Sequence, residues 1–362
     1  MTPQKILVIR FSSIGDVVLT APAIHALHEQ FPAAEIHLLT KKAVAPVWKG
    51  DERVNVRFFD PDDRHFGLPG FFRFLAELRA EKYDVVVDLH GLPKVRALTF
   101  ALGRPALHYD KASMARRRYV KTKRPPAEIV HSARRYVRAL APLGIDPEQP
   151  LVPAIGVDER AAKHVGSLVG PVGIKGRMLV GIAPGSQWFT KQWGWENFDA
   201  IVRRLSDQGQ WVALVGGKDE RDRCEQLAQG RKALNFAGLL NLQETLALMD
   251  FCRLFVSNDS GPMHMAGARG ADVIALFGST TKELGFWPLA PRSAILEVQG
   301  LACRPCDPHG RAACPEGHFR CMRELSVDRV WSEIQTFLGP PPQSPPPAGG
   351  SDDEGLFHFG ND

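Results

Sequence analysis

The chain has 362 residues, of which 44% are hydrophobic and 23% are charged, and its formal net charge is +5. This length suits two domains of ordinary globular composition, and the small charge excess does not choose between an anionic substrate, a membrane surface and nucleic acid. The start, MTPQKILVIRF, lacks the continuous apolar run of a signal peptide, and no segment has the roughly 18 uncharged apolar residues of a membrane span, so we expect a cytoplasmic protein.

Short apolar runs alternate with amphipathic stretches in the first half of the chain. The pattern predicts helices at residues 17–31 and 71–82 and strands at residues 5–11, 35–39 and 83–89. Because this rhythm builds a parallel sheet covered by helices, we expect an α/β domain over residues 1–165.

The rhythm stops in residues 142–177, which are rich in Pro and Gly and are the predicted linker. It resumes with predicted strands at 178–183, 211–215, 254–257 and 272–277 and predicted helices at 195–208, 219–229, 242–250 and 326–338. We therefore expect a second Rossmann-like, doubly wound domain over residues 175–338 that faces the first across a cleft. Residues 339–362 are rich in Pro, Gly and acidic residues and are predicted to form a disordered tail.

The first strand-to-helix turn, Ser12–Asp16, places a carboxylate at the edge of the first sheet where ligands bind. Asp16 can serve there as a general base that takes a proton from a sugar hydroxyl, or it can be a helix N-cap without a chemical role. Burial beside Ile14 and Val17 would raise its pKa and make it a stronger base.

The turn after strand 178–183 combines small residues with a hydroxyl and a nearby lysine. Its backbone N–H groups, the Ser186 hydroxyl and the Lys191 ammonium are suited to a diphosphate, with Gln187 in the same turn. The alternative is a plain loop with a solvated lysine.

The segment SNDSGPMHMA follows strand 254–257 and opens a helix of small residues. Free N–H groups at the start of that helix, with the positive end of its dipole, would stabilise charge on a leaving nucleoside diphosphate. His264 can add a donor or can be a structural helix histidine. The candidate donor-site residues here are Asp259, Ser260, Gly261, Pro262 and His264.

Glu220 follows the turn after strand 211–215. It can accept hydrogen bonds from ribose hydroxyls, or it can be an acid that favours a helix N-terminus. Residues 235–239 are candidates for the wall of a base pocket.

Three segments, ILVIRFSSIGDVVLTAPAIHAL, APGSQWFTKQW and VSNDSGPMHMA, occur in this order. In sequence and spacing they resemble glycosyltransferase family 9, the bacterial heptosyltransferases, and the likeness runs from about residue 5 to residue 338. The resemblance implies a GT-B fold, ADP-heptose as donor, a lipopolysaccharide inner-core sugar as acceptor and inversion at the anomeric carbon. Some members use another nucleotide sugar, which stays an alternative.

The resemblance also implies a role for each matching residue. Asp16 matches the general base, Glu220 the ribose-binding acid, and Asp259 the residue that holds heptose hydroxyls. Several members have Thr at the position of Ser260, and the hydroxyl is retained here. The remaining matches are Ser186 and Lys191, which would contact the diphosphate and the heptose, and Gly261 and His264 of the donor loop. We expect Lys191 and the helix N-terminus to take the place of a metal ion, so that no cofactor is needed.

A basic stretch covers residues 116–124 of the first domain. It is a candidate for binding anionic groups of the acceptor and the anionic inner face of the cytoplasmic membrane, which would make the protein peripheral there. The alternative is a solvated basic loop. The candidate acceptor-binding residues are Arg116, Arg117, Arg118 and Lys121.

Four cysteines, Cys303, Cys306, Cys314 and Cys321, lie close together with two histidines between them. The first two form a CxxC pair, which is a good half of a zinc site, but the second pair is separated by six residues and is not a typical second half. A structural zinc, reduced thiols and an adventitious disulfide all fit this spacing, and none belongs to the transfer chemistry.

Two other classes of function compete with a glycosyltransferase. A nicotinamide-dependent dehydrogenase would need a G-x-G-x-x-G turn after a strand, and no such turn is present. A zinc- or nucleic-acid-binding module without catalysis would use the cysteines and the basic stretch, but it would leave the segment SNDSGPMHMA unexplained. We therefore expect no nucleic-acid partner.

Overall fold

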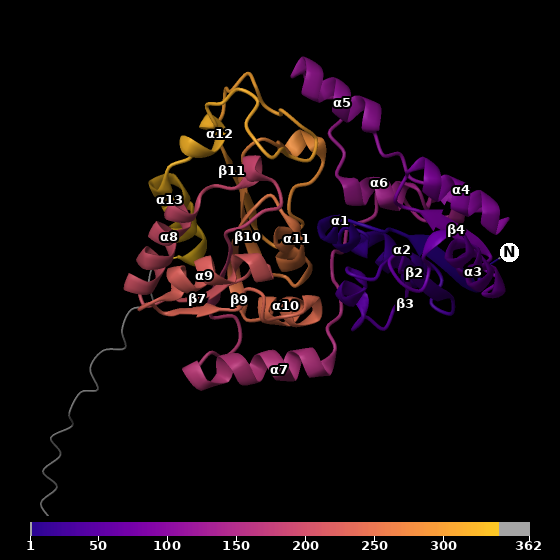
Figure 1. Ribbon diagram of the computed structural model, residues 1–362, viewed down its shortest axis with the longest axis horizontal. Coiled ribbons are helices and arrows are strands. Elements are labelled where there is room, and N and C mark those ends of the chain that lie inside the picture. Colours follow the sequence, from indigo (N-terminus) through magenta and orange to yellow (C-terminus); the bar gives the residue numbers. More distant parts are fainter. Residues whose placement is uncertain (1, 340–362) are drawn as a thin grey trace, which may run out of the picture.

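The computed structural model describes residues 2–339 and contains two parallel β-sheets, each packed between layers of helices (Figure 1). The first sheet lies within residues 1–165 and the second within residues 175–338, although the domain limits themselves stay a prediction. The tail predicted over residues 339–362 lies outside the described residues apart from Gly339.

The first sheet has the strand order β3-β2-β1-β4-β5, and all its neighbouring strands run parallel. Buried apolar residues fill its central strands, as expected for a sheet covered on both faces. The strands are β1 (Lys5–Ile9), β2 (Glu35–Lys41), β3 (Asn55–Phe59), β4 (Val85–Asp88) and β5 (Ala106–His108).

Helices α2 and α6 share a core with one face of this sheet, while α3 and α4 share a core with the other. The single helix predicted at 17–31 is two helices, because the chain turns at Leu19 and Thr20 and a new helix begins at Ala21, with Pro22 in its first turn. The helical segments are α1 (Ile14–Val18), α2 (Ala21–Gln30), η1 (Ala45–Trp48), α3 (Gly67–Ala80), α4 (Pro93–Leu102), α5 (Ser113–Thr122), α6 (Ser132–Arg138) and η2 (Ala141–Leu143).

The second sheet has the strand order β11-β10-β9-β6-β7-β8, again with parallel neighbours. Two βαβ halves therefore run outward from the central pair β6 and β9, which confirms the predicted doubly wound arrangement. The strands are β6 (Leu179–Ala183), β7 (Trp211–Leu214), β8 (Ala233–Asn235), β9 (Cys252–Asn258), β10 (Asp272–Phe277) and β11 (Ser293–Glu297).

The predicted linker contains a helix that its composition concealed. Asp158 caps this helix, α7 (Glu159–Val169), by accepting a hydrogen bond from the Ala161 N–H, and α7 packs against α10. The other helical segments of this half are η3 (Gly170–Val172), η4 (Phe189–Lys191), α8 (Trp195–Asp207), η5 (Lys218–Glu220), α9 (Arg221–Ala228), α10 (Leu242–Met249), α11 (Gly261–Ala268), η6 (Lys282–Leu284), α12 (Arg320–Arg323) and α13 (Val327–Leu338).

Each sheet reverses its winding direction at one pair of strands, β1 and β4 in the first and β6 and β9 in the second. In open α/β sheets ligands bind beyond the carboxyl ends of the strands at such a reversal. The turns after these strands are therefore where a site is expected. Within residues 2–339, none of the helices combines the length and apolar character needed to cross a bilayer.

Candidate active site

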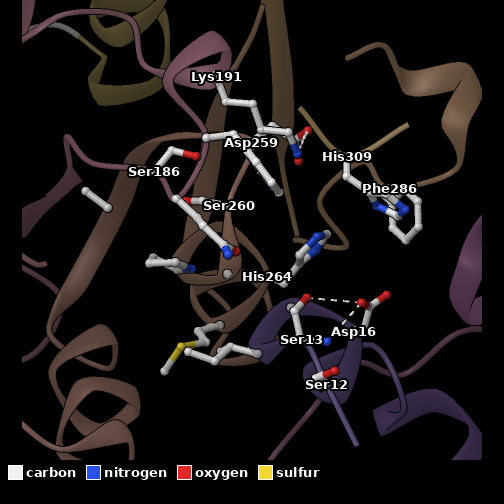
Figure 2. Close-up of a pocket in the computed structure, with 18 of the residues that line it drawn as sticks. Ser12, Ser13, Asp16, Ser186, Lys191, Asp259, Ser260, His264, Phe286 and His309 are labelled. Carbon is white, nitrogen blue, oxygen red and sulfur yellow. Dashed lines mark hydrogen bonds and ion pairs between the residues drawn. The ribbon is translucent and has the colours of Figure 1, made fainter. Parts of the chain in front are cut away.

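A cavity of about 960 Å³ lies between the two sheets, walled by the turn after β1 and by the turns after β6 and β9 (Figure 2). The structure thus brings together segments that are up to about 250 residues apart. Every residue predicted for catalysis and donor binding lines this cavity, namely Asp16, Ser186, Gln187, Lys191, Glu220, Asp259, Ser260, Gly261, Pro262 and His264.

Asp16 is the third residue of α1, and the N-cap is Ser13. The backbone N–H and the hydroxyl of Ser13 donate to Oδ2 of Asp16 at 3.1 and 3.0 Å, and Arg10 Nη2 lies 2.7 Å from the same oxygen. Within residues 2–339, Oδ1 of Asp16 accepts no hydrogen bond. One carboxylate oxygen therefore fixes the turn and the other is left for a ligand.

The pKa of Asp16 moves in the direction opposite to the one expected from burial alone. Burial of the carboxylate is the largest influence and raises the pKa, but the charge of Arg10 and the hydrogen bonds from Ser13 and Arg10 together hold it below its usual range. The expectation of a base strengthened by its apolar neighbours is therefore wrong, because the sequence did not indicate that Arg10 reaches the carboxylate.

On the opposite wall, Lys191 and Asp259 form an ion pair of 2.7 Å (Figure 2). The Thr280 hydroxyl donates to the same carboxylate at 2.6 Å. Burial raises the pKa of Asp259, but Lys191 and Thr280 outweigh it and leave the pKa lowered. Asp259 is thus an ionised, fixed acceptor, and it holds the lysine ammonium at the cavity wall.

The amino-terminal ends of α11 and α1 meet at the bottom of the cavity. A Cβ on Gly261 would lie 3.2 Å from Ile14 Cγ2, and a Cβ on Gly15 would lie 2.8 Å from His264 Cδ2, so the contact depends on two glycines. Ser260 is the N-cap of α11, Gly261 is its first residue and Pro262 its second. The first residues of α11 line the same cavity as Asp16, and a helix N-terminus leaves its first N–H groups without intrahelical partners.

His264 is buried between the two carboxylates of the site. Burial lowers its pKa to about 4, although Asp259 and Asp16 act in the opposite direction. Its Nδ1 has no hydrogen-bond partner within residues 2–339. The imidazole is therefore neutral at physiological pH.

Glu220 lines the cavity and its carboxylate packs against the backbone of Gly185 and Gly216. A Cβ on Gly185 would overlap with the Glu220 carboxylate, and Gly216 is similarly close. The Gly217 N–H donates to Glu220 Oε2 at 2.8 Å, and burial raises the pKa of the carboxyl. The Glu220 carboxylate caps η5, which agrees with the alternative role of an acid at a helix N-terminus. Glu220 also lines the cavity.

The family model described as glycosyltransferase family 9 (heptosyltransferase) matches residues 71–318. The chain belongs to glycosyltransferase family 9. Lipopolysaccharide heptosyltransferase 3 of Escherichia coli is 27% identical over 281 residues, which cover 74% of this chain and 81% of that protein. Lipopolysaccharide heptosyltransferase 1 of Pseudomonas aeruginosa is 25% identical over 361 residues, which cover 93% and 99%.

Solved structures confirm the fold of this family 9 glycosyltransferase as GT-B. A glycosyltransferase family 9 structure from Veillonella parvula superposes with a TM-score of 0.77 at 21% identity, covering 92% of this chain and 97% of that one. The Escherichia coli heptosyltransferase WaaC with ADP-2-deoxy-2-fluoro heptose superposes with a TM-score of 0.68 at 20% identity, covering 92% and 99%.

The basic stretch of the family 9 chain is a helix, α5, and not a loop. Arg116 alone among its four candidates lines the cavity, where it donates to Ser132 Oγ at 2.8 Å and stacks 4.5 Å from the centre of the Phe286 ring. Arg117, Arg118 and Lys121 are exposed and do not reach the cavity, so their role in acceptor binding stays a prediction.

Other residues that line the cavity were not predicted from the sequence. Arg10, His90 and Lys111 line the wall of the first domain, and His309 lies beside Phe286 in Figure 2. Among these residues, only Arg10 is marked by its local sequence, because it is a charged residue that directly follows the buried strand β1. Lys111 forms no ion pair within residues 2–339, and burial lowers its pKa.

The four clustered cysteines are free thiols in the structure. Within residues 2–339, no three or more His, Cys, Asp or Glu side chains are grouped so that they could hold a metal ion. Burial raises the pKa of Cys306, and it raises that of Cys321 to about 11. Cys306 and Cys321 are therefore poor nucleophiles in this arrangement.

Proposed function

We propose that this protein transfers a heptose from ADP-heptose to an inner-core sugar of lipopolysaccharide, with inversion at the anomeric carbon and without a metal ion. The observation that carries the proposal is the pairing of a free carboxylate oxygen, Oδ1 of Asp16, with the N-terminus of α11 and Lys191 across one cavity. The heptosyltransferase relatives and the WaaC complex support the choice of donor and acceptor.

The second domain is the proposed donor side. The N–H groups at the start of α11, the Ser186 hydroxyl and Lys191 would bind the diphosphate and stabilise the charge that builds on it as the glycosidic bond breaks. Glu220, above Gly185, would accept hydrogen bonds from the ribose. Asp259 would hold heptose hydroxyls.

The first domain is the proposed acceptor side. The acceptor hydroxyl would give its proton to Oδ1 of Asp16 and attack the anomeric carbon from the face opposite ADP. Because Arg10 lowers the pKa of Asp16, the carboxylate is ionised before the acceptor binds. Arg116 and Lys111, cations without an ion pair within residues 2–339, would bind anionic groups of the acceptor. We also propose that the reaction takes place in the cytoplasm, at the inner face of the membrane that holds this acceptor.

The test is a transfer assay with purified protein in EDTA, a panel of nucleotide sugars and truncated lipopolysaccharide acceptors, with products identified by mass spectrometry. Asp16→Asn should retain ADP binding and lose turnover by roughly 10²- to 10⁴-fold. The matched control Asp63→Asn, at an exposed carboxylate outside the cavity, should keep wild-type turnover. Transfer of a different sugar would replace heptose in the proposal, and full activity of Asp16→Asn would remove Asp16 from the mechanism.

A further inference from the structure

Four bulky apolar side chains are exposed on or beside helices α3 and α4 of the first domain. Phe66 and Leu68 are each 73% exposed, Phe72 is 62% exposed and Phe100 is 88% exposed. Exposed apolar groups that gather on one surface indicate an interaction site.

Phe72 and Phe100 lie on one outer surface. Phe72 and Arg79 are seven residues apart in α3 and share a face of that helix. Arg79 Nη2 donates to the carbonyl of Ala101 at 2.6 Å, beside Phe100 at the end of α4. The two helices are therefore side by side, on the part of the first domain that points away from the second domain (Figure 1).

The same surface is basic. Arg73, Lys94, Arg96 and Arg104 are exposed, and within residues 2–339 none of them forms an ion pair. The sequence of α4 contains no acidic residue, and the acid of α3, Glu77, is paired with Arg64. Aromatic and aliphatic groups among unpaired cations are complementary to an anionic lipid surface.

The amino-terminal end of α4 lies near the acceptor wall of the cavity. His90 lines the cavity, and α4 begins three residues later at Pro93. Farther along the chain, α5 places Arg116 in the cavity and leaves Arg117 and Arg118 exposed. Helix α4 therefore runs from the neighbourhood of the acceptor wall to the outer surface that carries Phe100.

We propose that the outer surface of α3 and α4 docks on an anionic phospholipid membrane, with Phe66, Leu68, Phe72 and Phe100 entering the headgroup region. The four cations contact lipid phosphates, and no helix crosses the bilayer. The inference rests on the proposed function in one respect, because the proposed lipid-linked acceptor is what gives the protein a reason to bind a membrane.

The test is co-sedimentation of the full chain with vesicles of phosphatidylcholine, with and without phosphatidylglycerol. The wild type should bind the anionic vesicles, and the double variant Phe72→Ser, Phe100→Ser should lower the partition coefficient at least tenfold, on the order of the loss of one fully buried apolar side chain. The triple variant Arg73→Gln, Lys94→Gln, Arg96→Gln should lower it on the order of a hundredfold and remove the preference for phosphatidylglycerol. Leu68→Ser should weaken binding, whereas the matched variant Leu168→Ser on α7 should not.

Transfer to a deacylated, water-soluble acceptor separates this inference from the proposed function. The double variant should retain that transfer. Failure of the wild type to sediment, or equal binding by wild type and double variant, would overturn the membrane assignment even if heptose transfer is observed. A dimer in analytical ultracentrifugation that the double variant abolishes would assign the surface to a second copy of the chain and also overturn it. Vesicle binding in the expected pattern without heptose transfer would keep the surface and reject the proposed function.

Discussion

Replacing Arg10 by methionine should move the acid limb of the pH–rate profile to higher pH. Arg10 Nη2 and Asp16 Oδ2 are 2.7 Å apart, and the two side chains are only 6% and 20% exposed. Two unit charges about 4 Å apart interact by about 4 kcal/mol at an effective dielectric constant of about 20. Methionine removes this attraction and leaves the hydrogen bonds from Ser13 in place. Since about 1.4 kcal/mol corresponds to one pH unit, even a third of the interaction would displace the limb measurably.

The direction of the shift in the acid limb follows from the opposing effects of Arg10 and of burial on the pKa of Asp16. With Arg10 the pKa lies below its usual range, so the carboxylate remains ionised in mild acid; without Arg10 the effect of burial dominates and the pKa rises. The assay is kcat/KM for ADP release from acid to neutral pH, with circular dichroism as a check on folding. Arg10→Lys retains a cation and should restore most of the acid limb. An unchanged limb in Arg10→Met, alongside an inactive Asp16→Asn, would refute the inferred electrostatic support.

Three further predictions concern other parts of the molecule. Gly185→Ala should raise the donor KM on the order of tenfold, since its methyl group overlaps with Glu220, whereas Gly166→Ala in α7, with open space around it, should not; equal kinetics would contradict the placement of Glu220. The folded-state pKa of His264 is about 4, below the ordinary 6.5, so the unfolded chain takes up the proton first as the pH falls. Stability in urea should therefore decline from about pH 6.5 to pH 4 by up to roughly 3 kcal/mol for this group, and His264→Gln should flatten that decline; an identical slope would argue against a buried neutral imidazole. Tyr119→Phe removes a hydroxyl that contacts Thr281 at 3.0 Å across the two domains, and should lower the free energy of unfolding by about 1 kcal/mol without changing ADP affinity; a loss of ADP affinity would show that this contact shapes the donor site.

Much of the fold was predictable because parallel central strands are continuous apolar runs. Strands β1, β4, β6, β7, β9 and β10 were all predicted in this way, with errors of at most two residues at their ends. Strand β3 was missed because much of it is exposed at a sheet edge, and β5 and β8 because each has only three residues. Helix α5 was not predicted, because its many charges conceal a single buried residue, Tyr119.

The sequence predicted the residues of the donor wall of the site better than those of the acceptor wall. The donor wall comes from compact turns after strands, where each polar residue has a local reason to face a ligand. The acceptor wall gathers His90, Lys111 and Arg116 from separate segments, and nothing in their local sequence indicates that they converge. For Arg10, a charge directly after a buried strand was visible, but its contact with Asp16 depends on the turn between them.

The glycine contact between α1 and α11 limits which substitutions the seam between the two sheets accepts. A methyl group on Gly15 would press on His264, and one on Gly261 would press on Ile14, so a larger residue at either position requires the facing side of the seam to shift. The two halves are therefore coupled sterically at these two positions. Cavity residues away from the seam, such as Lys111 and Arg116, are free of this constraint.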